Sequence, residues 1–136
     1  MGRRSRISLT IDSLNMILIA RLYSSREDSQ EPQDLVDFLS TAESPWLYDF
    51  LIDFRRFETD LSRSHMQHLT QKWAEIGRGR DHHKCMALIT QDYDLKLQLL
   101  NMTDVMPQRL IGYFKSTDEA LDWIATCGDR SYKIAG

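Results

Sequence analysis

The sequence lacks the features that would place the chain in a membrane or on nucleic acid. Its 136 residues contain no apolar run approaching the ~20 residues that a transmembrane helix needs. The formal net charge is -3, so there is no overall positive field to attract nucleic acid or an anionic membrane. We therefore expect no nucleic-acid partner and no stable membrane insertion.

Targeting signals and cysteines are equally sparse. The basic start is followed by Ile7 to Asp12, where polar and apolar residues alternate, so the unbroken apolar segment of a signal peptide is missing. The two cysteines lie far apart, Cys85 in an apolar segment and Cys127 near a predicted helix end. We expect both to be reduced and packed rather than joined. These observations predict a cytoplasmic protein.

The composition, with 42% hydrophobic and 27% charged residues, is typical of a globular protein. The length suits one domain, which we predict over residues 1–136, with a loose tail at 129–136. Residues 7–11 alternate as in a strand, and after turn residues a continuous apolar run covers 16–20, which predicts an antiparallel hairpin. Three further candidate strands cover residues 46–54, 85–89 and 110–114.

Helical spacing of apolar residues fills the intervals between these strands. Residues 94–106 fit either a helix or a strand, and their length favours a helix. The last helix opens with a capping box made by Ser116 and Glu119, and Gly128 is expected to end it. The four candidate helices cover residues 32–44, 62–77, 94–106 and 116–128.

The order of elements predicts an α/β fold with a mixed five-stranded sheet, in which an N-terminal antiparallel hairpin precedes parallel strands, and with about four helices. Strands separated by helices normally lie parallel through right-handed crossovers. Ligands and partners of open α/β sheets meet the carboxyl ends of the parallel strands. We therefore expect function at the edge where residues 53–56, 90–93 and 115–117 gather.

Several segments carry a resemblance to a known family. The matching pieces are Asn15-Met16-Ile17 in the hairpin, Asp53-Phe54-Arg55 at a strand end, Trp73 in the second helix, the strand Met86 to Ile89, and the ending YFKSTDEALDWI at residues 113–124. With these pieces in this order, the chain resembles the anti-sigma factor antagonist (STAS) superfamily, in particular its bacterial SpoIIAA-like branch.

This resemblance implies a small, non-enzymatic regulatory module that docks onto another protein through the rim near its second helix. In phosphorylated members, a serine at the start of that helix is the switch. Ser62 or Ser64 stands at about this place, although the Asp-Ser pair of the family motif is absent. Other relatives hold small apolar or lipid ligands against the sheet. A small apolar ligand between the sheet and the third helix is therefore the alternative.

We name the candidate docking surface the rim and define it by the residues Asp53, Arg55, Arg56, Ser62, Ser64 and Asp92. Nearby arginines and the helix dipole would favour a phosphate on either serine. A serine at a helix start is more commonly a plain cap, and Ser64 with Gln67 fits a capping box. Asp92 likewise precedes a predicted helix, where an aspartate more often caps than acts in acid–base chemistry.

No catalytic or metal site can be assembled from residue spacing. His65 and His68 share one face of a predicted helix, but no third ligand has a matching spacing, and His82 and His83 are adjacent in a loop. No Ser/His/Asp or Cys/His arrangement is recognisable. We therefore predict no enzyme, no metal and no cofactor. The protein partner is not identified by the sequence, and a homodimer formed through a sheet edge or a helix face is compatible with it.

Overall fold

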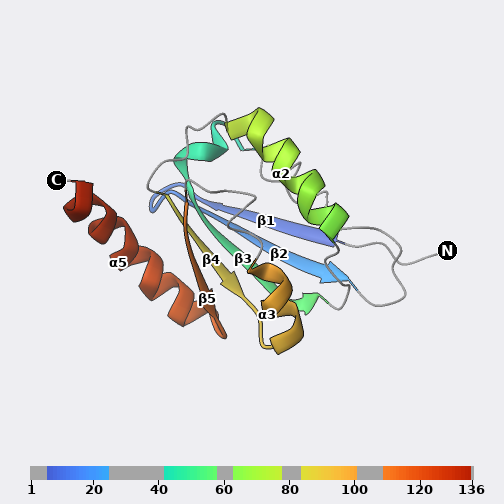
Figure 1. The fold of residues 1–136 in the computed structure, drawn as a ribbon. Coiled ribbons are helices and arrows are strands. Elements are labelled where there is room, and N and C mark those ends of the chain that lie inside the picture. The colour runs from blue at the N-terminus through green and yellow to red at the C-terminus, as the bar shows by residue number, and fades with distance from the viewer. Residues whose placement is uncertain (1–5, 25–41, 58–62, 78–83, 101–108, 136) are drawn as a thin grey trace.

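The computed structural model describes residues 6–24, 42–57, 63–77, 84–100 and 109–135. Figure 1 shows the elements along the chain. They are β1 (Arg6–Asp12), β2 (Ile17–Ser24), the short 3-10 helix η1 (Pro45–Leu47), β3 (Asp49–Phe57), α2 (Arg63–Gly77), β4 (Cys85–Ile89), α3 (Tyr93–Leu99), β5 (Leu110–Phe114) and α5 (Thr117–Ala135).

The strands form one mixed sheet in the order β1-β2-β3-β4-β5, which confirms the predicted fold class. β1 pairs antiparallel with β2, and every later neighbour is parallel. In the register of the central strands, Ile52 is opposite Leu88, and Met86 is opposite Ile111. The late strands therefore run side by side in one direction, and their carboxyl ends share one edge.

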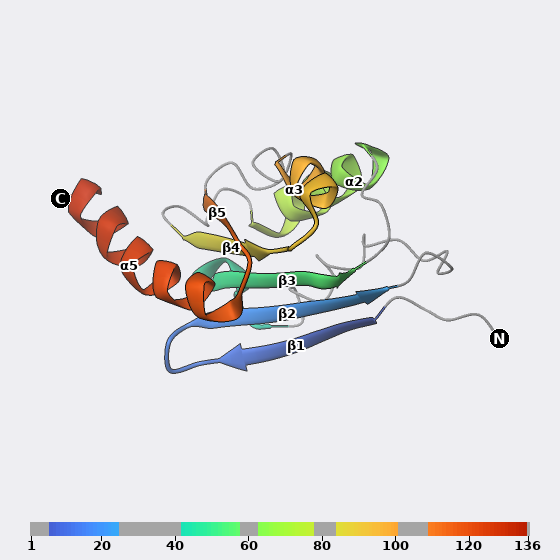
Figure 2. The same cartoon turned by 90° about the horizontal axis from the view of Figure 1, so that it is seen from below.

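Helices cover both faces of this sheet (Figure 2). The alternation of side chains along β3 sends Phe50, Ile52 and Phe54 into the larger core, and sends Leu51 into the smaller one. α2 and α3 close the larger core with Trp73, Leu95 and Leu99. α5 closes the smaller core with Ala120 and Ile124.

The predicted helices are confirmed in part. α2 follows the prediction closely, and the ambiguous segment is helical at α3. Residues 101–106 lie outside the described residues, as do residues 32–41 of the first predicted helix, and residues 42–44 are not helical.

The end of α5 corrects one expectation. Gly128 does not end this helix, which continues to Ala135. One glycine inside a helix costs only about 1 kcal/mol, and the arginine, lysine and alanine that follow it are good helix formers. The start is as predicted, because the Ser116 hydroxyl accepts a hydrogen bond from the Glu119 backbone N–H at 3.3 Å.

The expectation of two reduced cysteines is also wrong, because Cys85 and Cys127 form a disulfide. Cys85 is the first residue of β4, and Cys127 lies on α5, which packs on that strand. Their Cα atoms are 6.6 Å apart, within the range that a disulfide spans. A sequence separation of 42 residues gave no sign of this proximity.

Candidate docking surface

The centre of the rim is a carboxylate–arginine pair at the end of β3. Arg55 donates from Nε to Oδ1 of Asp53 at 3.0 Å and from an Nη to Oδ2 at 2.8 Å. The backbone N–H of Arg55 donates to the same Oδ1 at 2.9 Å. Asp53 is buried, with 8% of its surface exposed. A planar guanidinium bound at two points in this way has little freedom left to lose when a partner binds.

The charges around Asp53 keep it ionised. Burial raises the pKa of Asp53, but the hydrogen bonds and the positive charge of Arg55, together with the charge of Arg21, outweigh burial and hold this pKa below its usual value. Arg21 lies opposite Asp53 in the register of β2 and β3. The hydrogen bonds to Asp53 in turn raise the pKa of Arg55. The pair therefore carries both its charges at neutral pH.

Two further contacts join strand ends to the beginning of α5. An Nη of Arg55 donates to the hydroxyl of Thr117 at 3.0 Å, and the side-chain amide of Gln91 donates to the carbonyl of Lys115 at 3.2 Å. Sequence reasoning missed Thr117 as a rim residue. A usable signal existed, because the expected functional edge included residues 115–117, but nothing in the spacing paired Thr117 with Arg55.

Arg55 and Arg56 are neighbours at the end of β3, where a bulge interrupts the alternation of side chains. Asp53 shares the face of Leu51, which α5 covers, and Arg55 is held on that face by its bonds to Asp53 and Thr117. Beyond the bulge, Arg56 is paired with Tyr23 of β2. Both arginines are exposed at the strand end.

Asp92 acts as the N-cap of α3. Its Oδ1 accepts hydrogen bonds from the backbone N–H groups of Asp94 at 2.9 Å and Leu95 at 3.4 Å. The hydroxyl of the buried Thr90 accepts from the backbone N–H of Asp92 at 3.1 Å, which orders this turn from below. Capping leaves Asp92 exposed at the end of β4.

The comparisons with known proteins bear on the fold. No family model and no curated protein sequence matches the chain. Among solved structures, it is similar to an uncharacterized protein of the DUF3478 family from Shewanella loihica PV-4, whose crystal structure at 2.25 Å is described as having a SpoIIAA-like fold. The two share 19% identity over 88% of this chain and 93% of that chain, with a TM-score of 0.53. The chain has a SpoIIAA-like fold.

The two candidate serines are described only in part. α2 begins at Arg63, so the helix start lies where the sequence predicted it, and Ser64 is in the first turn. Ser62 lies outside the described residues. The structure thus brings Asp53 and Arg55 together, and it sets Arg56 and Asp92 at neighbouring strand ends.

The space beneath α3 holds core side chains. Leu95 and Leu99 are buried there in one cluster with Phe50 and Leu88. The Tyr113 hydroxyl donates to the carbonyl of Leu99 at 3.3 Å, and burial raises the pKa of this phenol. In this part of the chain, α3 packs on the SpoIIAA-like sheet directly.

Metal-binding clusters and membrane-spanning helices are both absent from the part of the chain that the structure describes. There, no group of three or more histidine, cysteine or carboxylate side chains is arranged to hold a metal ion. No helix in those ranges is long and apolar enough to cross a membrane. His82 and His83 lie outside the ranges.

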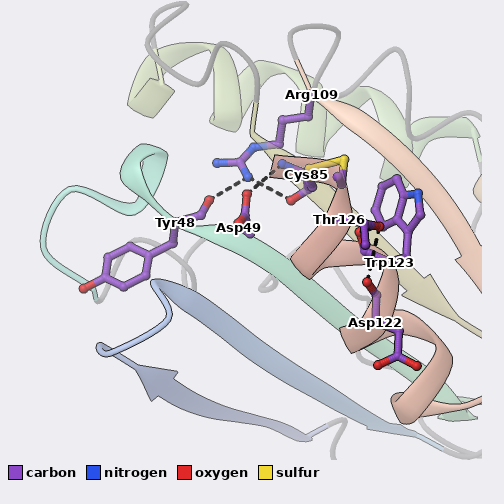
Figure 3. Close-up of a disulfide and its surroundings, with 8 residues drawn as sticks. Tyr48, Asp49, Cys85, Arg109, Asp122, Trp123 and Thr126 are labelled. Carbon is purple, nitrogen blue, oxygen red and sulfur yellow. Dashed lines mark hydrogen bonds between the residues drawn. A yellow bond between two sulfur atoms is a disulfide. The ribbon is translucent and has the colours of Figure 1, made fainter. Parts of the chain in front are cut away.

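At the opposite end of the sheet lies a cluster that the sequence did not signal. Arg109 is buried and donates from one Nη to the carbonyl of Tyr48 at 2.8 Å and to that of Cys85 at 3.4 Å (Figure 3). Its guanidinium carbon lies 3.7 Å from the ring centroid of Phe50 and 5.5 Å from that of Trp73. These contacts fasten the amino end of β5 to η1 and β4.

Replacing Asp53 by Asn should make the free energy of unfolding depend less on pH in the acid range. Because the folded pKa of Asp53 is lowered, its contribution is present above the unfolded value near 3.8 and is lost as pH falls through the folded pKa. Arg55 is 34% exposed, so solvent screens the pair, and we expect a loss of about 1 kcal/mol at neutral pH.

The measurement is urea unfolding of the wild type and of Asp53→Asn at about pH 6 and about pH 2. The gap between the two proteins should close at the lower pH. Asp122→Asn, the same change at an exposed carboxylate on α5, is the matched control and should behave as the wild type. An equal gap at both pH values would contradict the assignment.

Proposed function

We propose that this SpoIIAA-like chain is a non-enzymatic regulatory module that docks onto a protein partner through the rim. The observation that carries the proposal is the arrangement of Asp53, Arg55 and Thr117. A charged pair bound at two points and joined to α5 presents one fixed geometry. Such preorganisation lowers the entropic cost of binding.

The charge of the rim favours an acidic surface on the partner. Arg55 and Arg56 are exposed at the end of β3, and Arg21 adds a third positive charge beside Asp53. Complementary charge at the edge of an interface speeds association and rejects wrong partners.

Phosphorylation at Ser62 or Ser64 would tune this docking. A phosphate at the start of α2 would meet the positive end of the helix dipole. We expect a phosphopeptide containing one of these serines in protein isolated from its native cells. Mass spectrometry that finds complete coverage of both serines and no modification would remove this part of the proposal.

Charge reversal at the rim should weaken the complex. The partner is first captured with the wild-type chain and identified by mass spectrometry, and its dissociation constant is then measured by calorimetry. Arg56→Glu leaves the Asp53–Arg55 pair intact, so any loss of affinity is caused by the changed surface charge. We expect about tenfold weaker binding. The double change of Arg55 and Arg56 to Glu should weaken binding further.

Lys84→Glu is the matched control, because Lys84 directly precedes β4 at the opposite end of the sheet. It should bind the partner as the wild type does. Wild-type affinity in both rim variants would contradict docking through the rim. Native mass spectrometry of freshly purified protein separates the other outcomes. A bound apolar molecule would favour the ligand-binding alternative, and a doubled mass would identify a homodimer.

We further propose that the protein works in the cytoplasm. The globular composition is compatible with this location, the reduced cysteines expected there form a disulfide instead, and fractionation of the native cells tests the location.

A further inference from the structure

The disulfide joins the sheet to α5 at a position that the proposed function does not use. Cys85 opens β4 and is fully buried, and Cys127 is 3% exposed. The backbone of Cys85 is held independently of its sulfur, since its N–H donates to Oδ1 of Asp49 at 2.9 Å and its carbonyl accepts from Arg109. The strand end is therefore a fixed support for whatever is bonded to it.

Cys127 is the last buried side chain described on α5. Ala120, Ile124 and Cys127 follow one another at helical spacing and form the stripe that faces the sheet. Beyond Cys127 the helix continues to Ala135, and its final turns project away from the sheet in both views (Figures 1 and 2). The disulfide thus lies at the boundary between the packed part of α5 and its projecting part.

The packed part of α5 does not depend on the disulfide. Ala120 and Ile124 belong to the smaller core, and the Trp123 ring packs against Phe114 with centroids 5.3 Å apart. Ser116 caps the helix at its start. Breaking the bond between the sulfurs would leave these contacts in place and remove only the anchor at Cys127.

We propose that Cys85 and Cys127 form a redox-sensitive clamp, which fixes the distal half of α5 to the sheet when oxidised and releases it when reduced. The clamp goes beyond the proposed docking function and does not rest on it, but it does rest on the proposed cytoplasmic location. Cytoplasmic disulfides are characteristically transient or redox-sensing, so in the compartment we propose, the bond would respond to the thiol pool.

Glutathione disulfide is a sufficient oxidant. The thiolate of one cysteine attacks a sulfur of glutathione disulfide, which forms a mixed disulfide and releases one glutathione thiolate. The thiolate of the second cysteine then displaces the second glutathione, so the protein loses two electrons and two protons to two glutathione thiols. Reduced glutathione reverses both steps. Because Cys127 borders the projecting turns, fraying of one helix end exposes the bond without opening the core.

Equilibration of the whole protein in buffers of varied reduced-to-oxidised glutathione ratio tests the clamp. After an acid quench, alkylation of the unfolded protein and intact mass should show both cysteines protected at oxidising ratios and both labelled at the reducing ratios of a cell interior. In the reduced protein, amide hydrogens of residues 127–135 should exchange at least about tenfold faster, while those of β3 keep their protection.

Cys127→Ser and Cys85→Ala should both exchange like the reduced protein at every ratio. Two variants are used so that a folding defect in one does not decide the result. Ala125→Ser introduces the same side chain at an exposed position of α5 and should keep the redox response. Three outcomes would overturn the clamp. They are failure to form the disulfide in glutathione disulfide, persistence of the bond at every ratio, and equal exchange of residues 127–135 in the two states.

Discussion

Loss of the Cys85–Cys127 disulfide is expected to lower the free energy of unfolding by about 4 kcal/mol. The bond closes a loop with a sequence separation of 42 residues, so it removes many conformations from the unfolded chain. The chain-entropy relation gives about 4 kcal/mol for a loop of this length. A typical domain is stable by about 5–15 kcal/mol, so the reduced protein should remain folded.

Urea unfolding of the wild type and of Cys85→Ala, each with and without a reducing agent, measures this loss. The reducing agent should shift the midpoint of the wild type toward that of the variant and should leave the variant unchanged. Equal midpoints for the oxidised wild type and Cys85→Ala would mean that the bond does not constrain the unfolded chain. Hydrogen exchange of α5 reports the local clamp and can differ even if the global effect is small.

Arg109→Ala is expected to cost about 3–5 kcal/mol. The guanidinium donates to the carbonyls of Tyr48 and Cys85 and packs over the Phe50 ring. Truncation removes these donors from two carbonyls and leaves a cavity beside Trp73. Arg109→Lys keeps the charge but cannot reproduce the planar stack or the fork of donors, so it should fall between Arg109→Ala and the wild type.

The matched control is Arg56→Ala, which removes the same side chain from an exposed position and should change stability by no more than about 0.5 kcal/mol. Urea unfolding followed by circular dichroism gives the free energy of unfolding of each of these proteins. A loss below about 1 kcal/mol for Arg109→Ala would show that the aromatic cluster closes without the guanidinium.

Much of the SpoIIAA-like fold was predictable because its signals are local. The hairpin follows from alternation at residues 7–11, and α2 follows from helical spacing that ends at a glycine. The caps made by Asp92 and Ser116 act on backbone groups two or three residues away, within reach of a sequence pattern. The order of strands and helices then predicts a shared carboxyl edge, which the sheet has.

Reasoning from local signals failed where they competed with other terms. Gly128 was expected to end α5, but the helical preference of the residues after it outweighs the modest cost of one glycine. The segment now described as α3 satisfied both helical and strand periods, because leucines recur there at both spacings. Its length favoured the helix, and α3 confirms that reading.

The sequence by itself determined the elements, their order and the edge where rim residues gather, because backbone preferences and apolar periodicity act between neighbours. Only the tertiary structure decided which distant side chains meet: Arg55 with Thr117, Arg109 with Phe50, and Cys85 with Cys127. Such contacts depend on how helices cross the sheet. That geometry is set by the packing of the whole core, which no local pattern records.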